Sequence, residues 1–431
     1  MSNDETLTIL GAGIAGISAG YHAKQNDVKA VVYEAASRPG GLVDNFTING
    51  FRFDNAIHLS FATESEVREV FDRTDYVIHP AVSWCRDGDV WLKHPVQNNI
   101  FPLPVDEKVD LISGLIDRKE GPILNYEDWL LHQYGKAISN RWPLPYTKKY
   151  WTLQAKEMGI DWIGNRMRRA DVREILQGAF TAETPNHYYA KEMRYPSRGG
   201  YLSFIQALID DTNIHCDHRV IRIDLSNRTV YFENGKSVGF TSLINTLPLP
   251  KLIELIDEVP DDVRGAASSL FSTSIDLISV GFRVPDIQPH LWFYIYDADV
   301  LAARAYSPSI KSADNVPDGC SSLQFEIYSS VRNPQKNTPD EMKSNTLMAL
   351  RKFGILQEDS DVLFMHHKHM HWGNVVFDLG MEARRDLVIN WLKSVKIVSA
   401  GRFGEWDYLW SNQAFMSGKR AFEISQKSNG A

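Results

Sequence analysis

The start of the chain alternates short apolar runs with a glycine-rich turn, a pattern typical of a strand, helix, strand unit. The pattern predicts a strand from Thr6 to Leu10, a helix from Ile17 to Gln25 and a second strand from Val28 to Tyr33. The turn GAGIAG separates the first strand from the helix. This order predicts a βαβ unit with parallel strands.

The rest of the chain changes its periodicity several times. Residues 105–190 are helical in pattern and rich in Trp, Tyr and Arg, and residues 219–237 predict a hairpin with an Asn-Gly turn. Short strand-like runs across 270–380 predict a second sheet, with one helix among them. Residues 396–406 repeat the strand and glycine turn of the start, and a helix follows, so we expect this unit to rejoin the first sheet.

Composition limits the classes of function. With 431 residues and 43% hydrophobic content, the chain can form more than one core, because single cores rarely exceed about 250–300 residues. The net charge of -8 gives no general attraction to nucleic acid or anionic lipid. An anionic ligand would therefore need a few well-placed cations.

Cysteine usage and hydropathy favour a cytoplasmic protein. Cys85, Cys216 and Cys320 form no metal-ligand spacing, so we expect no metal site and a reducing compartment. The polar N-terminus does not resemble a secretory signal, and no apolar stretch reaches the roughly 18 residues that a membrane span needs. The sequence leaves open whether the chain forms a homo-oligomer.

The glycines of the first turn have the spacing of a dinucleotide-binding fingerprint. Gly11 allows a tight turn, Gly13 lets a pyrophosphate approach the backbone, and Gly16 permits close packing of the helix. Glu34 ends the second strand, where a carboxylate would accept a hydrogen bond from a ribose hydroxyl. A tight turn without a ligand is the alternative, but the strand and helix around the glycines favour a bound dinucleotide.

Two glycine doublets indicate that the dinucleotide is FAD. Gly40 and Gly41 supply a second stretch of backbone beside Arg38, and Gly199 and Gly200 stand at another helix start. These features resemble the FAD-dependent family that includes amine oxidases, protoporphyrinogen oxidase and nucleotide-sugar mutases. The fold class that follows is α/β, a Rossmann-type FAD-binding domain with a helical insert and a second, mainly antiparallel sheet. We expect the FAD-binding domain at 1–100, 192–250 and 385–431, the helical insert at 101–191 and the second sheet at 251–384.

The C-terminal motif narrows the resemblance. The stretch GRFGEWDYLWSNQ is similar to the terminal motif of UDP-galactopyranose mutases of the eukaryotic type. The positions that match are Gly401, Arg402, Trp406, Tyr408, Asn412 and Gln413. The resemblance implies that Gly401 contacts FAD and that Arg402 is catalytic.

Other stretches resemble the same family in the same order. DNAIHLSF matches the segment with the flavin histidine, PYTKKYWTLQAKEMGIDWIGNRM matches the helical segment that ends in an arginine, and HLWFYIY with AARAYSP matches a sheet segment. The resemblance implies catalytic roles for His58, Arg166 and Arg304, and substrate contacts from Phe61, His94, Gln97, Trp151, Asn186, Trp292, Tyr294, Tyr408 and Asn412.

The resemblance also implies a reaction without net redox change. N5 of reduced FAD would attack the anomeric carbon of a nucleoside-diphosphate sugar, and the ring would reclose so that a pyranose becomes a furanose. UDP is the nucleotide that the family favours, polysaccharide biosynthesis is the setting, and NADPH or NADH is the expected reductant. Arg166 and Arg304, on two different predicted parts, would hold the diphosphate and fold the insert over the flavin.

Some positions depart from the family pattern. His94 and Val96 occupy the positions at which the family has an aromatic pair around uracil. Asn374 replaces a tyrosine of the family's pocket, and Ile57 replaces a glycine. The substrate could therefore carry a sugar other than galactose. An FAD-dependent oxidase or desaturase is the alternative function, and a non-catalytic FAD-stabilised partner protein is a third.

Two clusters of charged or titratable residues have structural interpretations. His367, His369 and His371 share one face of a predicted strand, with no carboxylate or cysteine at ligand spacing, so we expect a strand that borders an anionic pocket. Arg169 and Arg173 follow Arg166 at helical spacing, and we expect them on a solvated helix face.

Overall fold

The computed structural model describes residues 6–118, 120–164, 166–186 and 191–429. Its N-terminal part is a five-stranded parallel sheet in the order β19-β13-β1-β2-β9. The strands are β1 (Leu7–Leu10), β2 (Ala30–Tyr33), β9 (Ile214–His215), β13 (Leu243–Asn245) and β19 (Ile397–Ser399). The predicted βαβ unit is confirmed, and the last unit of the chain returns to this sheet as expected.

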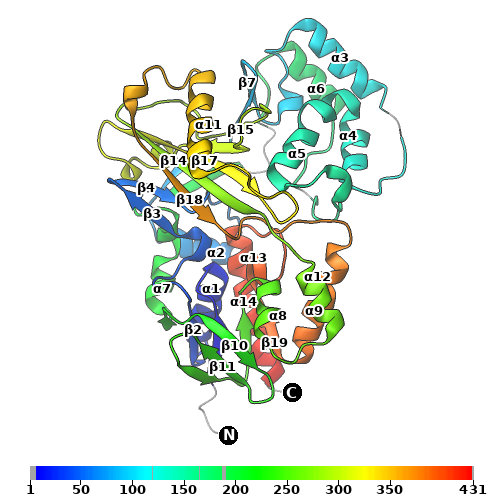
Figure 1. The fold of residues 1–431 in the computed structure, drawn as a ribbon. Helices are drawn as coiled ribbons and strands as arrows, with labels where there is room; N and C mark the ends of the chain where they lie inside the picture. Colours follow the sequence, from blue (N-terminus) through cyan, green and yellow to red (C-terminus); the bar gives the residue numbers. More distant parts are fainter. Residues whose placement is uncertain (1–5, 119, 165, 187–190, 430–431) are drawn as a thin grey trace.

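Two helices pack against each other and cover one side of the parallel sheet (Figure 1). They are α1 (Ile14–Gln25) and α14 (Ser411–Asn429). A Cβ on Gly16 would lie 1.9 Å from Gly11 O, and one on Gly418 would lie 2.1 Å from Ala15 O. Glycine at both positions therefore lets α1 approach both the first turn and α14.

The lower part of the molecule also holds the predicted hairpin and a group of helices (Figure 1). The predicted hairpin is extended to a three-stranded antiparallel sheet of β10 (Val220–Asp224), β11 (Thr229–Phe232) and β12 (Ser237–Gly239), with Gly235 at a φ of +81° in the second turn. The helices of this part are α7 (Gln206–Asp211), α8 (Leu249–Leu255), α9 (Asp261–Ser268), α12 (Met381–Ser394) and α13 (Gly401–Gly404).

The second sheet has seven strands in the order β18-β14-β17-β16-β15-β6-β7. Its strands are β6 (Trp84–Asp87), β7 (Val90–Lys93), β14 (Ser274–Phe282), β15 (Trp292–Ile295), β16 (Arg304–Tyr306), β17 (Ser321–Ser329) and β18 (Val362–Met370). Every neighbouring pair is antiparallel except β15 with β6. The expected boundary at residue 100 does not hold for β6 and β7, because their backbone hydrogen bonds place them in this sheet.

Smaller elements connect the two sheets, and one helix covers the large sheet. The connecting elements are β3 (Asn45–Ile48), β4 (Phe51–Asp54), α2 (Ser65–Phe71), β5 (Tyr76–Pro80), β8 (Glu192–Pro196) and α10 (Pro308–Lys311). Helix α11 (Pro339–Lys352) packs against β14 and β18, and Met342, Ala349 and Leu350 complete an apolar core with the sheet.

The helical insert forms the upper right part of the molecule in Figure 1. Its helices are α3 (Val105–Ile116), α4 (Tyr126–Arg141), α5 (Pro143–Trp151) and α6 (Val172–Phe180). Arg173 lies exposed on α6 as expected, whereas the expectation for Arg169 is wrong, because Arg166 lies in a turn and residues 168–170 are not helical. Asp171 caps α6, and its carboxylate accepts from the backbone N–H groups of Arg173 and Glu174, so the helix begins after two of the three arginines.

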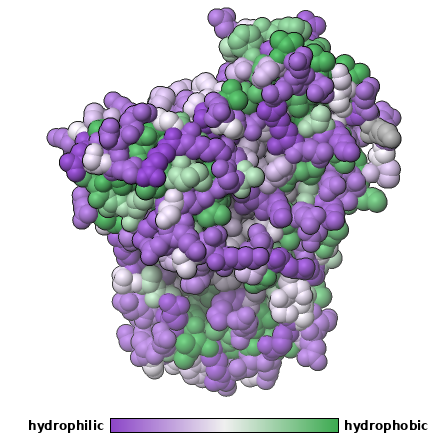
Figure 2. Space-filling view, turned by 45° about the horizontal axis from the view of Figure 1, so that its top comes forward, coloured by the Kyte–Doolittle hydropathy of each residue, from purple (hydrophilic) through white to green (hydrophobic). Residues whose placement is uncertain are grey.

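The surface of the molecule is mostly hydrophilic, and apolar residues gather over the helical insert (Figure 2). Val105, Val109 and Ile116 of α3 are exposed there. None of the helices in the described ranges combines the length and the apolar character that crossing a bilayer requires.

A buried ion pair joins β4 to α10 beneath the interface of the two sheets. Lys311 Nζ donates to Asp54, and both side chains are fully buried. Asp54 also accepts from the Tyr195 hydroxyl at 2.9 Å and from Tyr201 N at 3.2 Å. Every charge in this cluster therefore has a partner, and removing one of them leaves the other charge unpaired in the core.

Replacing Lys311 with Met should lower the free energy of unfolding by about 3–5 kcal/mol, because Asp54 then stays buried without its cation. Denaturant titration would measure the loss. Lys343→Met is the control, since Lys343 pairs at 3.2 Å with the exposed Asp340 and should change stability by less than about 1 kcal/mol. Equal effects of the two substitutions would contradict the prediction.

Candidate functional site

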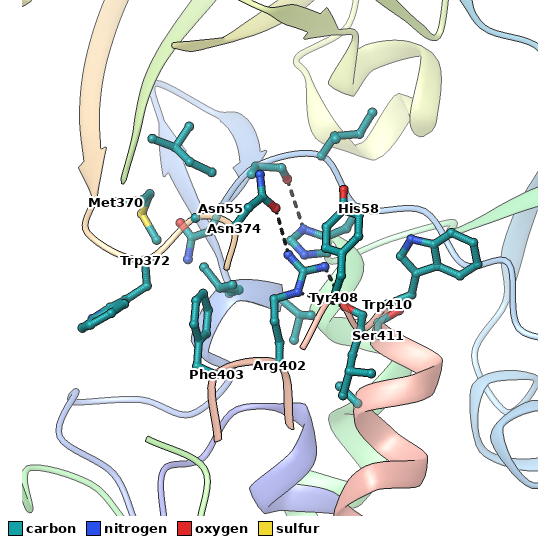
Figure 3. Close-up of a pocket in the computed structure, with 18 of the residues that line it drawn as sticks. Asn55, His58, Met370, Trp372, Asn374, Arg402, Phe403, Tyr408, Trp410 and Ser411 are labelled. Atoms are coloured by element: carbon teal, nitrogen blue, oxygen red, sulfur yellow. Dashed lines mark hydrogen bonds between the residues drawn. The ribbon is translucent and has the colours of Figure 1, made fainter. Parts of the chain in front are cut away.

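One cavity of about 1080 Å³ runs between the parallel sheet, the large sheet and the helical insert. Its walls come from the glycine turns at one end, from the segment after β4 and the segment before α14 in the middle, and from β15, β16 and α5 at the other end. Figure 3 shows the middle section. The cavity thus brings together segments from almost the whole length of the chain.

The turn with Gly11 and Gly13 and the turn with Gly40 and Gly41 lie side by side at one end of the cavity. Gly40 N donates to Ala12 O at 2.8 Å, and Gly13 and Gly40 form an isolated bridge. Gly11 has a φ of +94°, a conformation that side chains rarely adopt. A Cβ on Gly13 would meet no atom within 4 Å, because this face of the turn opens on the cavity. The N-terminus of α1 therefore has an accessible backbone at which a pyrophosphate fits.

Glu34 stands at the end of β2 beside the same turn. Its carboxylate accepts from Ala12 N at 2.7 Å and from Ala36 N at 2.8 Å. These two backbone donors fix the carboxylate against the turn and leave it at the cavity wall. The placement fits the ribose of a dinucleotide, whose hydroxyl can donate to Glu34.

His58 lies in the middle of the cavity, four residues after the buried Asp54. Its Nδ1 is 3.1 Å from Ala56 O, which can only accept, so Nδ1 carries the proton and Nε2 is an acceptor. Burial, followed by the nearby charges of Lys311 and Arg402, lowers the pKa of His58 to about 4, although Asp54 acts in the other direction. The imidazole is therefore neutral at neutral pH.

Arg402 occupies the centre of Figure 3 and reaches towards Asn374 beside His58. Its Nε and Nη2 donate to Leu409 O at 2.9 and 2.6 Å, and its Nη1 donates to Asn374 Oδ1 at 3.2 Å. Asn374 is 4% exposed, and its Nδ2 has no hydrogen-bond partner among the described residues. A buried donor without a partner at a cavity wall is suited to an acceptor oxygen of a bound ligand.

Arg166 reaches the same place from the helical insert. Its Nη2 donates to Tyr408 O and, at 3.2 Å, to Gln413 Oε1. Its guanidinium lies over the rings of Tyr408 and Trp410, 4.3 and 4.5 Å from their centroids. The Tyr408 hydroxyl is in turn 3.0 Å from that of Tyr150.

Arg304 approaches the other side of this tyrosine pair from β16. Its guanidinium is 5.2 Å from the ring centroid of Tyr150, and its Nε donates to the buried Glu326. Within the described residues, neither terminal nitrogen of Arg304 has a hydrogen-bond partner. Burial acts to lower the pKa of Arg304, but the negative charge of Glu326 outweighs it, and the pKa lies well above its usual value. The guanidinium is thus a fixed cation with donors left for an anion.

Aromatic rings form the walls at the far end of the cavity. The rings of His94 and Tyr294 are 4.8 Å apart, and Tyr146 meets Tyr294 edge to face at 5.7 Å. Trp151 and Trp292 also line this end. Burial lowers the pKa of His94 to about 4, so this imidazole is neutral as well.

Most of the predicted site residues lie at this one cavity. The lining includes Gly11, Gly13, Glu34, Gly40, Gly41, His58, Phe61, His94, Gln97, Trp151, Arg166, Trp292, Tyr294, Arg304, Gly401, Arg402 and Tyr408. Gly16 is not in the lining, and it has the packing role that its spacing predicted.

Five predicted contacts lie outside the lining and make other bonds. Arg38 donates to Asp44 at 2.7 Å, Asn186 to Ala81 O at 2.7 Å and Asn412 to Glu64 at 2.9 Å. Gly199 N donates to Asp314 at 2.9 Å, and a Cβ on Gly200 would meet Asn45 at 2.7 Å. The second doublet therefore packs against β3 and the segment after α10.

The histidine cluster has a carboxylate that the sequence did not indicate. His367 Nε2 and His369 Nδ1 lie 2.7 and 2.9 Å from the same oxygen of Asp276, which comes from the neighbouring strand β14. His369 and His371 line the cavity. No group of side chains in the described ranges is arranged to hold a metal ion.

Sequence reasoning missed several residues of this site. Tyr146, Tyr150, Trp162 and Trp410 line the cavity, and Glu326 holds Arg304. The aromatic residues carry no distinctive spacing. Glu326 could have been found, because an acid inside the apolar run SSLQFEIYSS indicates a buried charge with a partner.

Comparison with known proteins agrees with this geometry. Residues 9–74 match the model of an NAD(P)-binding Rossmann-like domain, and residues 123–421 match that of flavin containing amine oxidoreductases. Reduced UDP-galactopyranose mutase has a similar structure, with a TM-score of 0.93 and 24% identity over 98% of this chain and 96% of the other.

Two further structures are similar at lower identity. A protein from Exiguobacterium sp. 255-15 that carries the name protoporphyrinogen oxidase has a TM-score of 0.75 and 16% identity, over 99% and 100% of the chains. A redesigned putrescine oxidase has a TM-score of 0.64 and 14% identity, over 98% and 99%. All three likenesses show the shared fold, and the family model covers more than half of the chain. The protein therefore belongs to the flavin containing amine oxidoreductase family, and the cofactor of that family is a flavin.

Proposed function

We propose that the protein is a flavin-dependent mutase that interconverts the pyranose and furanose forms of a nucleoside-diphosphate sugar. One observation carries this proposal: Arg166 and Arg304 converge from two parts of the molecule on the Tyr150 and Tyr408 hydroxyl pair. Two guanidinium groups on one side of an aromatic cavity suit a diphosphate, which has several acceptor oxygens. The fold shared with UDP-galactopyranose mutase supports UDP as the nucleotide.

The glycine end of the cavity would hold FAD. The backbone at Gly11, Gly13, Gly40 and Gly41 would leave room for its pyrophosphate, which would accept from N–H groups at the N-terminus of α1, and Glu34 would accept from its ribose. When bound in the reduced form, FAD supplies a nucleophilic nitrogen for attack on the anomeric carbon. NADPH or NADH is the reductant that we propose.

The arginines would bind and stabilise the leaving diphosphate. Glu326 fixes Arg304, so its terminal nitrogens are oriented before the ligand arrives and lose little freedom on binding. Arg166 and the Tyr408 hydroxyl add donors from the opposite side. Because aromatic walls surround this end of the cavity, these donors would act in a lower dielectric than bulk water and stabilise charge more strongly.

The middle of the cavity would orient the bound ligands through His58, Arg402 and Asn374. The neutral His58 offers an acceptor at Nε2, while Arg402 and Asn374 Nδ2 offer donors. The sugar would lie among Phe61, Trp151 and Trp292, and the base near His94, Gln97 and Tyr294.

An FAD-dependent oxidase of the amine oxidase type is the second candidate, because the family model supports it. The cavity disfavours an amine substrate. An amine is cationic near neutral pH, and Arg166, Arg304 and Arg402 would repel it. A negatively charged substrate is therefore more consistent with this site.

The proposed activity predicts turnover only with reduced flavin. Under anaerobic conditions, dithionite-reduced protein should convert UDP-galactopyranose, or another UDP-sugar of a panel, into the furanose form, as chromatography would show. The oxidised protein should be inactive. Steady oxygen consumption with an amine, together with no change of any nucleotide-sugar, would support the oxidase instead.

Arg304→Ala should weaken UDP binding by about 10–100-fold, because it removes charge-assisted hydrogen bonds to the diphosphate. FAD content should stay normal. Arg283→Ala is the matched control, since Arg283 follows β14 and is exposed outside the cavity. Isothermal titration with UDP would compare the three proteins, and loss of FAD with intact UDP binding would contradict the assignment.

Two glycine substitutions should separate cofactor binding from folding. Gly13 has a φ of -74°, which alanine adopts freely, so Gly13→Ala should keep the stability of the flavin-free protein within about 0.5 kcal/mol. Its methyl group would occupy the space of the pyrophosphate, and FAD affinity should fall at least about tenfold. Gly16→Ala should lower both the stability and the FAD affinity, because its Cβ would overlap Gly11 O. Equal FAD affinity of Gly13→Ala and wild type, measured by fluorescence titration, would argue against this cofactor site.

A further inference from the structure

Glu326 lies in the middle of β17 and is fully buried. It pairs across the sheet with Arg304 on one side and with Leu277 on the other. The three donors to its carboxylate are Arg304 Nε, the Tyr328 hydroxyl and Ile57 N, the last at 2.8 Å. A carboxylate in an apolar strand is costly without partners, and these three donors compensate for its burial.

The two oxygens of this carboxylate contact different parts of the cavity wall. Oε2 accepts from Arg304, whose terminal nitrogens remain for an anion, and Oε1 accepts from the backbone of Ile57. Ile57 immediately precedes His58, and the neutral His58 ring lies in the middle section of the cavity. A single rigid side chain thus spans the distance between the anion-binding end and the His58 segment.

We propose that Glu326 is a positioning residue that couples anion binding at Arg304 to the backbone segment that carries His58. The inference rests on the proposed function, since it takes the anion to be the diphosphate of a nucleotide-sugar. A phosphate on the terminal nitrogens of Arg304 requires the guanidinium orientation that Glu326 sets, and a shift of the carboxylate towards the bound pair also changes its bond to Ile57 N. Coupling of this kind is reciprocal, so the state of the His58 segment also changes the affinity for the diphosphate.

Glu326→Gln tests the coupling in the FAD-loaded protein. The amide keeps the size of the side chain, and its oxygen can still accept from Ile57 N. Its NH₂ group faces Arg304 Nε, which can only donate, so Arg304 loses its partner. UDP affinity should fall at least about tenfold, and the change in flavin absorption at saturating UDP should become smaller. FAD content and the UDP-free flavin spectrum should match wild type.

Asp297→Asn is the matched control, because Asp297 is another buried carboxylate beside the same sheet and pairs with Lys352 at 2.7 Å. It should leave UDP affinity within about twofold of wild type. Glu326→Asp is the second variant, for the case in which the amide prevents folding. Its shorter carboxylate keeps the charge but cannot reach both partners, so its UDP affinity should lie between those of wild type and Glu326→Gln.

The outcomes separate this inference from the proposed function. Wild-type protein that does not bind UDP would contradict the proposed function. Wild-type protein that binds UDP, together with Glu326 variants that bind it equally well and give the same absorption change, would overturn the coupling. Variants that lose FAD before UDP is added would also overturn it, because Glu326 would then be a general structural residue.

Discussion

The placement of three half-buried arginines around one aromatic cavity is the constraint on which the site depends. A guanidinium has five donors and no acceptor, so each arginine needs carbonyl, carboxylate or amide oxygens at fixed places. Glu326 meets this need for Arg304, the carbonyl of Tyr408 for Arg166, and the carbonyl of Leu409 for Arg402. These partners come from the large sheet and from the segment before α14. Partners from separate parts of the chain therefore allow three like charges to share one cavity.

The charge of the site contrasts with that of the whole chain. The protein carries a net charge of -8, yet the cavity of the site is lined by Arg166, Arg304 and Arg402 and by the neutral His58 and His94. Burial explains the neutral histidines, since it disfavours the charged imidazole of His58 and His94. Under the proposed function, selectivity for an anion would thus arise from a few partnered arginines, while the acidic net charge discourages unspecific binding of polyanions.

The sequence predicted what depends on neighbours along the chain. The turn with Gly11 and Gly16, the place of Glu34 and the return of residues 396–406 to the first sheet follow from local spacing, and the structure confirms their geometry. The partners of buried charges could not be predicted in this way. Glu326 meets Ile57 across 269 positions, and Asp276 meets His367 across 91. The turn at Arg166 was missed because the spacing of Arg166, Arg169 and Arg173 suggested one continuous helix. The cap at Asp171 instead begins the helix after the first two of these arginines.

The two arginines that face the tyrosine pair differ in how they are held, and the difference bears on how a ligand enters. Arg304 is anchored in the middle of a seven-stranded sheet by the fully buried carboxylate of Glu326. Arg166 lies in turns of the helical insert and is held by a carbonyl, an amide oxygen and two rings, all of them neutral. Neutral contacts are exchanged for a phosphate at lower cost than a buried ion pair. In the proposed function, Arg304 would therefore be the preorganised half of the anion site, and Arg166 the half that rearranges when the ligand binds.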